Sequence, residues 1–375
     1  MLLHIGKVPT LVVSSVEAAR EVLKIQDLTF ATRPFSAAGA TLTNGCRNVS
    51  FAPDGEHWRQ GKKAAVVHLL SPNKVHGLLY AFSDGLACRV VAGSCAAREV
   101  RTQRFREAIN GATAILSGPR LEELFPSLAL KKLAKKWNAL LDEIVEVDFI
   151  DLLLSADPAV DYAFSRDDVK VIFMDIIAAG TDTSYVVLEW AMAEWMKNPA
   201  LMERTQREVR EAAGGKPAPT EDDVAGMSHL RAVVKEVLRL HMPAPLLIPR
   251  EAMAATRVLG YDAMATDPDW WEVPEEFRPE RFLREEPPPP ADFRGSDFQF
   301  LPFGAGRRMC PGMNFAICEV ELALAGLLYH FDWSLPAGMV PEDLDMAESS
   351  GITVRLKTPL RLVAVPRSPN SGMLT

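Results

Sequence analysis

One long helical segment constrains the fold more than any other feature of the chain. Residues 165–198, SRDDVKVIFMDIIAAGTDTSYVVLEWAMAEWMKN, contain no proline, and Pro199 follows them directly. Ser165 and the acidic pair Asp167 and Asp168 are typical of a helix N-terminus. Some 30 residues in one helix extend roughly 45–50 Å at ~1.5 Å per residue. The segment therefore predicts a mainly helical protein that contains one long helix.

Shorter helices and a little strand are expected on both sides of this segment. VPTLVVSS predicts a strand, and Ser15 at its end is placed to cap the next helix. Two further helices end at a glycine pair and at the proline cluster MPAPLLIP. The fold class is therefore mainly α with a small β region, and residues 1–375 are expected to form a single domain. The expected elements are helices at 16–25, from about 57, and at 199–215, 229–240 and 311–329, and a β-hairpin at 351–365.

Composition excludes several classes of protein. A net charge of −8 and a pI near 5.5 argue against nucleic acid as a partner. The five cysteines include no CxxC pair, so we expect neither a disulfide framework nor a zinc site, and we expect a reducing environment. No uninterrupted apolar run reaches the ~18 residues of a spanning helix, and the N-terminus lacks the layout of a signal peptide. The chain is therefore expected to be soluble or peripherally attached to a membrane.

A glycine-rich turn with one cysteine, FGAGRRMCPG at residues 303–312, carries the strongest chemical signal. Gly304 and Gly306 allow the backbone to fold tightly and to approach a bound group. Pro311 suits the first position of a helix, which places Cys310 at or near its N-cap. A helix N-terminus and nearby arginine lower a thiol pKa from ~8.5 into the range ~3.5–7.5, and the resulting thiolate binds metals. A buried structural cysteine is the ordinary alternative, and the complete pattern favours a ligand.

The long helix carries a polar run, AAGTDTS, at residues 178–184. Gly180 costs a helix about 1 kcal/mol relative to alanine, and the four polar residues after it are poor helix formers. This run predicts a local distortion that admits a ligand. Asp182 beside Thr183 pairs an acid with an alcohol, which suits a proton relay. A hydrated polar patch is the alternative for this run taken alone.

FGAGRRMCPG resembles the haem-binding signature of the cytochrome P450 monooxygenases, in which a cysteine thiolate is the proximal iron ligand. The resemblance implies that Cys310 binds iron, that Arg308 pairs with a haem propionate and that Phe303 shields the sulfur, with Gly306 shaping the turn. AGTDTS is similar to the oxygen-activation motif of the family. By that resemblance Thr183 orients dioxygen and water and Asp182 supports proton delivery.

Two further motifs resemble those of the same family. Glu236 and Arg239 share a helix face at a spacing of three, and an exposed ion pair there contributes only ~0.2–1 kcal/mol. With Arg281 in FRPERF they resemble the Glu–Arg–Arg triad that supports the haem-binding core. An amphipathic surface helix explains HWRQGKK equally well, but the resemblance implies propionate contacts for three more residues. These are Trp58, Lys62 and Arg250.

The resemblance implies a haem-thiolate fold with a reduced β region and a monooxygenase function of the plant secondary-metabolite type. One oxygen atom from O2 enters an apolar small organic substrate, and electrons come from NADPH through NADPH-cytochrome P450 reductase, which docks near Arg307. The implied location is the cytosolic face of the endoplasmic reticulum membrane. Apolar residues expected to line the substrate pocket are Phe173, Ile176, Ile177, residues 246–248, Ile352 and Thr353.

The chain is shorter than the microsomal plant members that it resembles, and an N-terminal anchor is expected to be absent. Segments are expected to be missing after Val75, around Val147 and between Tyr261 and Ala265. Loss of interior strands leaves backbone groups unpaired, so the alternative function is an inactive, truncated or mis-assembled member. A peroxide-rearranging member that is not an oxygenase is a third alternative, which the pair Asp182 and Thr183 disfavours.

Overall fold

The computed structural model describes residues 1–5, 8–70, 162–254, 256, 258, 267–283, 291–349 and 351–367. The chain divides into two compact units, each built from three stretches. The expected single domain over residues 1–375 stays a prediction, and the three expected deletion points lie outside the described residues. The first unit is Met1–Asp182, Leu246–Met264 and Arg294–Met313, and the second is Thr183–Pro245, Ala265–Phe293 and Asn314–Thr375.

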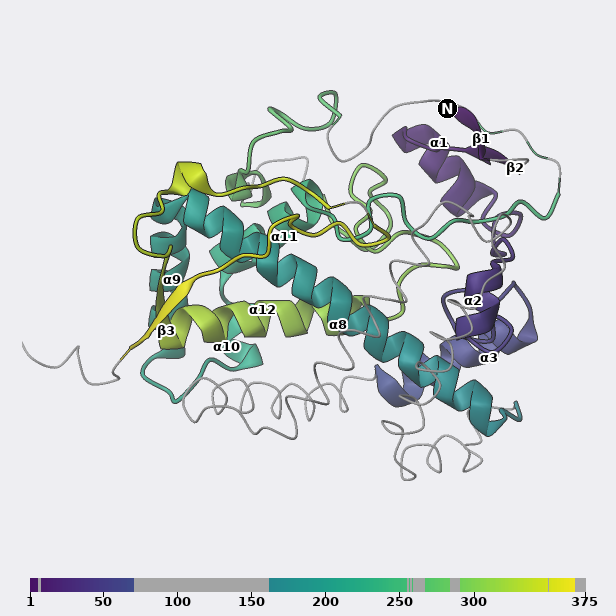
Figure 1. Cartoon of the computed structure of the whole chain (residues 1–375), viewed down its shortest axis with the longest axis horizontal. Coiled ribbons are helices and arrows are strands. Elements are labelled where there is room, and N and C mark those ends of the chain that lie inside the picture. The colour runs from purple at the N-terminus through teal and green to yellow at the C-terminus, as the bar shows by residue number, and fades with distance from the viewer. Residues whose placement is uncertain are drawn as a thin grey trace, which may run out of the picture. The chain divides into compact units, whose positions relative to one another are not determined.

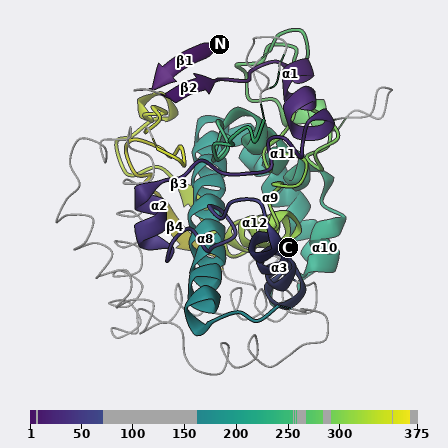
Figure 2. The ribbon, with the colours of Figure 1, turned by 90° about the vertical axis from the view of Figure 1, so that its right-hand side faces the viewer.

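The first unit begins with a two-stranded antiparallel ribbon in which Leu2 lies opposite Leu11 (Figure 2). The predicted cap is confirmed, because the Ser15 hydroxyl accepts a hydrogen bond of 3.2 Å from the Ala18 N–H. Two of the helices continue into a π-helical turn. The elements are β1 (Leu2–Ile5), β2 (Val8–Leu11), α1 (Val16–Arg20) with η1 (Glu21–Ile25), α2 (Ala37–Leu42), and α3 (Glu56–Ala64) with η2 (Ala65–Leu69).

Two apolar clusters form the core of the first unit. One joins α1 and η1 to residues 298–305, which lead into the cysteine turn, and its buried members include Leu23, Leu301 and Ala305. The other packs Ile172 of the long helix against Val49 and Ala65. A Cβ at Gly61 would lie 3.3 Å from Ile172 Cδ1, so glycine in α3 permits the close approach of these helices.

Helix α8 (Arg166–Lys197) is the predicted long helix, with 32 residues. It continues through residues 178–184 without a break, and the local distortion expected there stays a prediction. Buried side chains before and after the polar run, such as Met174 and Val186, hold the helix in place and outweigh the propensity cost of about 1 kcal/mol. By length and a mean hydropathy of 1.5 alone, α8 would suffice to cross a membrane. Its fully buried Trp190 and Trp195 are also features of a core helix.

The second unit contains the C-terminal half of α8 with α9, α11 and α12 gathered around it (Figure 1). Gly214 ends α9 in the left-handed conformation, as the glycine pair predicted. The predicted hairpin at 351–365 is wrong, because its last residues pair with the earlier strand β3 instead. The elements are α9 (Pro199–Ala213), α10 (Glu221–Ala225), α11 (Ser228–Leu240), η4 (Pro279–Phe282), α12 (Met313–His330, which begins at the end of the first unit), β3 (Phe331–Ser334), η5 (Pro341–Asp343) and β4 (Val363–Pro366).

Candidate functional site

The cysteine turn, residues 303–312, folds back on itself within the first unit. The Cys310 N–H donates to the Phe303 carbonyl at 3.0 Å, and the Met309 N–H donates to the Gly306 carbonyl at 3.0 Å. Gly306 has φ +70°, and a Cβ there would lie 2.2 Å from the Leu23 carbonyl oxygen. No side chain fits at that distance, so the turn requires glycine at 306 for conformation and for space.

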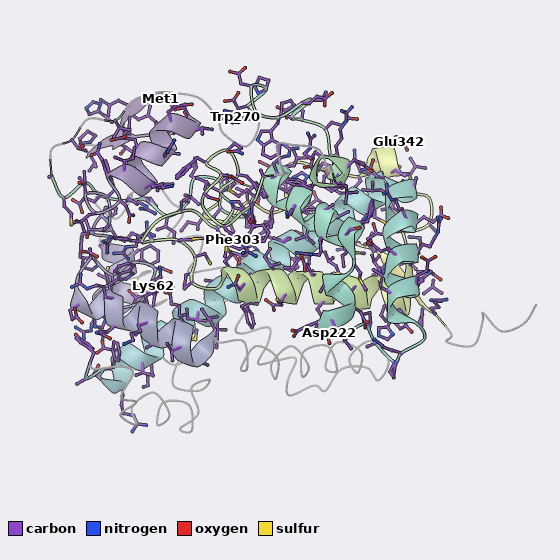
Figure 3. All side chains as sticks on the ribbon, turned by 180° about the vertical axis from the view of Figure 1, so that it is seen from behind. Met1, Lys62, Asp222, Trp270, Phe303 and Glu342 are labelled. Carbon is purple, nitrogen blue, oxygen red and sulfur yellow. The ribbon has the colours of Figure 1, made fainter. Side chains whose placement is uncertain are left out.

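Three side chains from other segments hold the backbone of the turn. The Asp27 carboxylate accepts from the Arg307 N–H at 3.0 Å. Lys62 Nζ on α3 donates to the Arg307 carbonyl at 2.6 Å, and Arg250 donates to the Ala305 carbonyl at 2.9 Å. Figure 3 labels Lys62 and Phe303 with all side chains drawn as sticks. Sequence reasoning missed Asp27, since a single acid in a loop gives no pattern.

The Cys310 thiol has solvent-accessible surface, yet protein surrounds the sulfur closely enough for desolvation to dominate. Burial raises the pKa of the thiol, and the Gly312 N–H and the charge of Lys62 lower it only in part. The prediction of a lowered thiol pKa is therefore wrong. Cys310 does lie near the start of α12, but the helix begins at Met313 and not at Pro311, so Cys310 precedes it by three residues.

Four basic residues, Arg33, Lys62, Arg250 and Arg308, form a cation cluster in the first unit. Burial lowers the pKa of Arg33 to about 9, with further lowering from Arg308 and Arg250. Burial also lowers the pKa of Arg308 to about 10, and those of Lys62 and Arg250 fall for the same reason. Like charges that repel one another in a partly desolvated place favour binding of an anion. Sequence reasoning missed Arg33, which stands alone before a proline.

Arg308 and Arg33 are oriented by backbone carbonyls. Arg308 donates to the Ala31 carbonyl at 2.6 Å and to the Ala52 carbonyl at 2.7 Å. Arg33 donates to the Ser50 carbonyl at 3.0 Å and also to two carbonyls that precede Arg250. A guanidinium has five N–H donors, so these contacts fix each side chain and leave donors for a ligand.

Trp58 on α3 lies under the cation cluster. The Arg308 guanidinium carbon is 3.9 Å from its ring centre, and Lys62 Nζ is 5.6 Å from it. The Trp58 side chain is buried, and its indole N–H has no hydrogen-bond acceptor among the described residues. A buried donor without an acceptor is uncommon and adds to the anion-binding character of this place.

The polar run of α8 spans both units, with Asp182 in the first and Thr183 in the second. Both side chains are partly buried, and Ala179 is exposed. A Cβ at Gly180 would meet no described atom within 4 Å. The next residue, Ser184, donates to Glu319 of α12 at 2.9 Å, so one hydroxyl of the run has a structural partner within the second unit.

The residues expected to line a pocket lie in different environments. Ile176 packs against the Val49 cluster, and Leu247 packs over Gly304, with 3.6 Å from its side chain to a Cβ placed there. Leu246 is 83% exposed, whereas Thr353 is buried. The four others, Phe173, Ile177, Ile248 and Ile352, are partly buried, and their pocket contacts stay predictions.

The predicted triad forms one buried network in the second unit. Glu236 accepts two hydrogen bonds of 2.9 Å from Arg239 and one of 3.0 Å from Arg281. The Arg278 N–H donates to the same carboxylate at 2.8 Å. Glu236 is fully buried, so the exposed ion pair that the spacing also allowed is wrong. Trp271 covers the network, with its ring centre 5.3 Å from the Arg239 guanidinium carbon.

Comparisons with known proteins agree on one family. The sequence model of the Cytochrome P450 family matches residues 120–362. Cytochrome P450 71A1 of Persea americana is 37% identical over 97% of this chain and 86% of its own length. Indole-2-monooxygenase of Zea mays is 37% identical over 97% of this chain and 80% of its own length. Strychnine-11-hydroxylase of Strychnos nux-vomica is 37% identical over 98% of this chain and 84% of its own length.

Solved structures agree with the sequence relatives. Structures of a zebrafish cytochrome P450 with abiraterone and with progesterone share 25% identity with this chain at TM-scores of 0.73 and 0.77. Each comparison covers 98% of this chain and 96% of the solved one. The alignment with the Persea americana relative is 436 residues long, whereas 97% of 375 residues is about 364, so about 70 aligned positions have no residue in this chain.

Proposed function

The chain belongs to the cytochrome P450 family, and we propose that it inserts one oxygen atom from O2 into an apolar small organic substrate of plant secondary metabolism. Membership makes it an oxidoreductase that uses haem, dioxygen and a redox partner. The proposed electron donor is NADPH through NADPH-cytochrome P450 reductase. The named relatives include a monooxygenase and a hydroxylase of plants, which supports this reaction class.

In this proposal Cys310 holds the haem iron as a thiolate. Haem, when bound, supplies the iron centre at which dioxygen is activated. Burial raises the pKa of the Cys310 thiol, so Cys310 would hold the iron only after losing its proton, as coordinating thiols do. The Gly312 N–H that reaches the sulfur then stabilises its negative charge.

The cation cluster beside the cysteine turn is the observation that carries the proposal. Haem has two propionate carboxylates. Four cations that are buried or partly buried, together with an indole N–H that has no acceptor among the described residues, fit such a dianion in charge and in donor number. Arg308 and Trp58 have donors to offer, and Lys62 and Arg250 also hold the turn. Arg33 joins this set, although the family resemblance had not suggested it.

On α8, we assign proton delivery to Asp182 and Thr183. The unbroken helix holds the alcohol and the acid at fixed neighbouring positions. The open space beside Gly180 supports a ligand surface along this stretch. Thr183 then orients water and dioxygen by hydrogen bonding, and Asp182 passes protons toward it.

The proposed surroundings of the enzyme follow from its plant relatives. We place it at the cytosolic face of the endoplasmic reticulum membrane, with the reductase near Arg307. Arg307 lies half exposed and pairs with Asp27 at 3.4 Å, which reduces its free positive charge. The inactive alternative draws support from the positions that this chain lacks relative to its relatives.

The reduced carbon-monoxide difference spectrum tests the proposal. The chain is expressed with haem, and we expect the red-shifted Soret band of a thiolate-bound haem. Cys310→Ala is expected to abolish this band, and Cys318→Ala, a change at another free cysteine, is expected to keep it. No such band in the unmodified chain, or the same band in Cys310→Ala, contradicts the haem-thiolate assignment. A normal band without NADPH-dependent turnover supports the inactive alternative.

A further inference from the structure

Asp175 of α8 is a partly buried acid to which the motifs assign no function. Its carboxylate accepts a hydrogen bond of 2.8 Å from the Ser50 N–H. Hydrogen bonding from the Ser50 hydroxyl, the Asn48 side chain and the Val49 N–H also lowers the pKa of this carboxyl. The three residues that supply these hydrogen bonds are consecutive, so Asp175 fixes one short loop.

The carbonyl groups of that loop bind the arginines of the cation cluster. We call residues 48–52 the carbonyl loop. Its Ser50 carbonyl accepts from Arg33 at 3.0 Å, and its Val49 and Ala52 carbonyls accept from Arg308 at 3.4 and 2.7 Å. Asp175 therefore accepts hydrogen bonds from the N–H side of the loop, while Arg33 and Arg308 donate hydrogen bonds to its carbonyl groups. All of these residues belong to the first unit.

We propose that Asp175 is a positioning residue for the cofactor: it fixes the carbonyl loop, and the loop in turn holds Arg33 and Arg308 ready for an anionic ligand. This inference rests on the proposed function, in which that ligand is the pair of haem carboxylates. A free arginine side chain has about 2 kcal/mol of rotamer entropy to lose. Carbonyl anchors remove that freedom before the ligand binds, which improves affinity by preorganisation.

The charge of Asp175 also stabilises the charged form of Arg33. Asp175 raises the pKa of Arg33, whereas Arg308 and Arg250 lower it. The carboxylate therefore offsets part of the repulsion that keeps the arginines apart. Burial raises the pKa of Asp175 itself, and the four hydrogen bonds oppose that rise. Replacement by asparagine removes one acceptor oxygen and directs an NH2 group at N–H donors of the loop.

Haem release measures this effect without any assay of activity. The holoprotein is mixed with excess apomyoglobin, and the rate of haem transfer is followed in the Soret region. We expect Asp175→Asn to release haem about 10- to 100-fold faster, the range seen when outer partners of a metal site are lost. Asp168→Asn is the matched control. Asp168 is a buried acid one heptad earlier on α8, and it pairs with Arg47 rather than with the carbonyl loop. We expect its haem release rate to match that of the unmodified protein.

Two further variants show whether Asp175 acts through Arg33. In an Arg33→Met background, Asp175→Asn should raise the release rate by a smaller factor than in the unmodified chain. If Asp175→Asn does not fold, Ser50→Ala removes one of the four donors, and we expect a smaller increase in the same rate. The inference is overturned if the haem release rate is unchanged in Asp175→Asn or in Ser50→Ala. It is also overturned if Asp168→Asn raises the rate as much as Asp175→Asn does, or if the effects of Asp175→Asn and Arg33→Met on the rate are fully additive. Failure of the unmodified chain to form a thiolate-bound haem overturns the proposed function instead.

Discussion

Arg308 stacks on Trp58, with its guanidinium carbon 3.9 Å from the ring centre. This contact joins the cysteine turn to α3, which are more than 200 residues apart in sequence. A desolvated cation–π contact contributes on the order of 2 kcal/mol. The pair also places an indole N–H without an acceptor beside guanidinium N–H groups, so one contact serves both the fold and the proposed anion site.

The indole N–H of Trp58 is separable from its ring. Trp58→Phe keeps an aromatic face for Arg308 and removes the indole donor. We expect the variant to fold and to lose haem about tenfold faster, because a hydrogen bond to a charged group is worth roughly 1.5–3 kcal/mol. Haem transfer to apomyoglobin measures the rate. Trp333→Phe removes an indole donor that is bonded to the Leu327 carbonyl at 2.9 Å, and it should leave the rate unchanged. Equal rates for Trp58→Phe and the unmodified protein contradict the assignment.

Gly306 is expected to tolerate no side chain. Gly306→Ala adds a Cβ only 2.2 Å from the Leu23 carbonyl oxygen in a left-handed conformation, so the turn must move and haem binding should fail. Gly304→Ala has the same kind of φ, with contacts of 3.6 Å or more, and should cost only about 1–2 kcal/mol of unfolding free energy. Urea denaturation and the carbon-monoxide spectrum measure both variants. If Gly306→Ala and Gly304→Ala lose the same unfolding free energy and haem binding, the left-handed backbone alone, and not the short distance to Leu23, requires glycine at 306.

The buried triad should contribute far more to stability than a surface ion pair. Glu236→Gln leaves the charges of Arg239 and Arg281 without a carboxylate in a buried place, so we expect a loss of about 3–5 kcal/mol. Glu280→Gln removes the exposed pair with Arg204 at 3.4 Å and should cost less than about 1 kcal/mol. Denaturant unfolding gives both values. A loss below about 1 kcal/mol for Glu236→Gln would refute the structural importance of the network.

The proton relay predicts a defect in coupling rather than in haem binding. Thr183→Ala removes the hydroxyl of the acid–alcohol pair, so NADPH use should continue while the fraction that yields oxygenated product falls. Thr181→Ala alters an exposed threonine two residues earlier on the same helix, and it should leave coupling unchanged. The ratio of product formed to NADPH consumed is the measurement. Unchanged coupling in Thr183→Ala contradicts the relay.

Asp168 should make stability depend on pH in the acid range. Burial on its own raises its pKa, but hydrogen bonds from Arg47 and Ser165 outweigh burial and set the pKa at about 2, below the ordinary 3.8. The stabilisation is therefore complete above pH 3.8 and is lost as pH falls through about 2. Arg47 is partly exposed, so we expect only about 1 kcal/mol. The unfolding free energy of Asp168→Asn should fall less between pH 5 and pH 2 than that of the unmodified protein. Equal falls contradict the prediction.

The sequence by itself determined the features that depend on neighbouring residues. Helix α8 follows from an unbroken helical run, the Ser15 cap from a hydroxyl three residues before an N–H group, and the Glu236–Arg239 pair from helical spacing. The glycines of the cysteine turn also follow, because a tight turn needs left-handed backbone wherever it lies in a fold. These interactions span only a few residues, so their geometry is encoded locally.

Only the tertiary structure decided which distant residues meet. Asp27 and Arg33 reach the cysteine turn and its neighbours across more than 200 residues, and β4 pairs with β3 rather than within its own segment. The raised pKa of Cys310 has the same origin, because desolvation depends on everything packed around the sulfur and not on the adjacent helix alone. A local pattern fixes how a segment bends and what chemistry it offers. Long-range packing fixes its partners and its dielectric surroundings, because these depend on the closure of the whole chain.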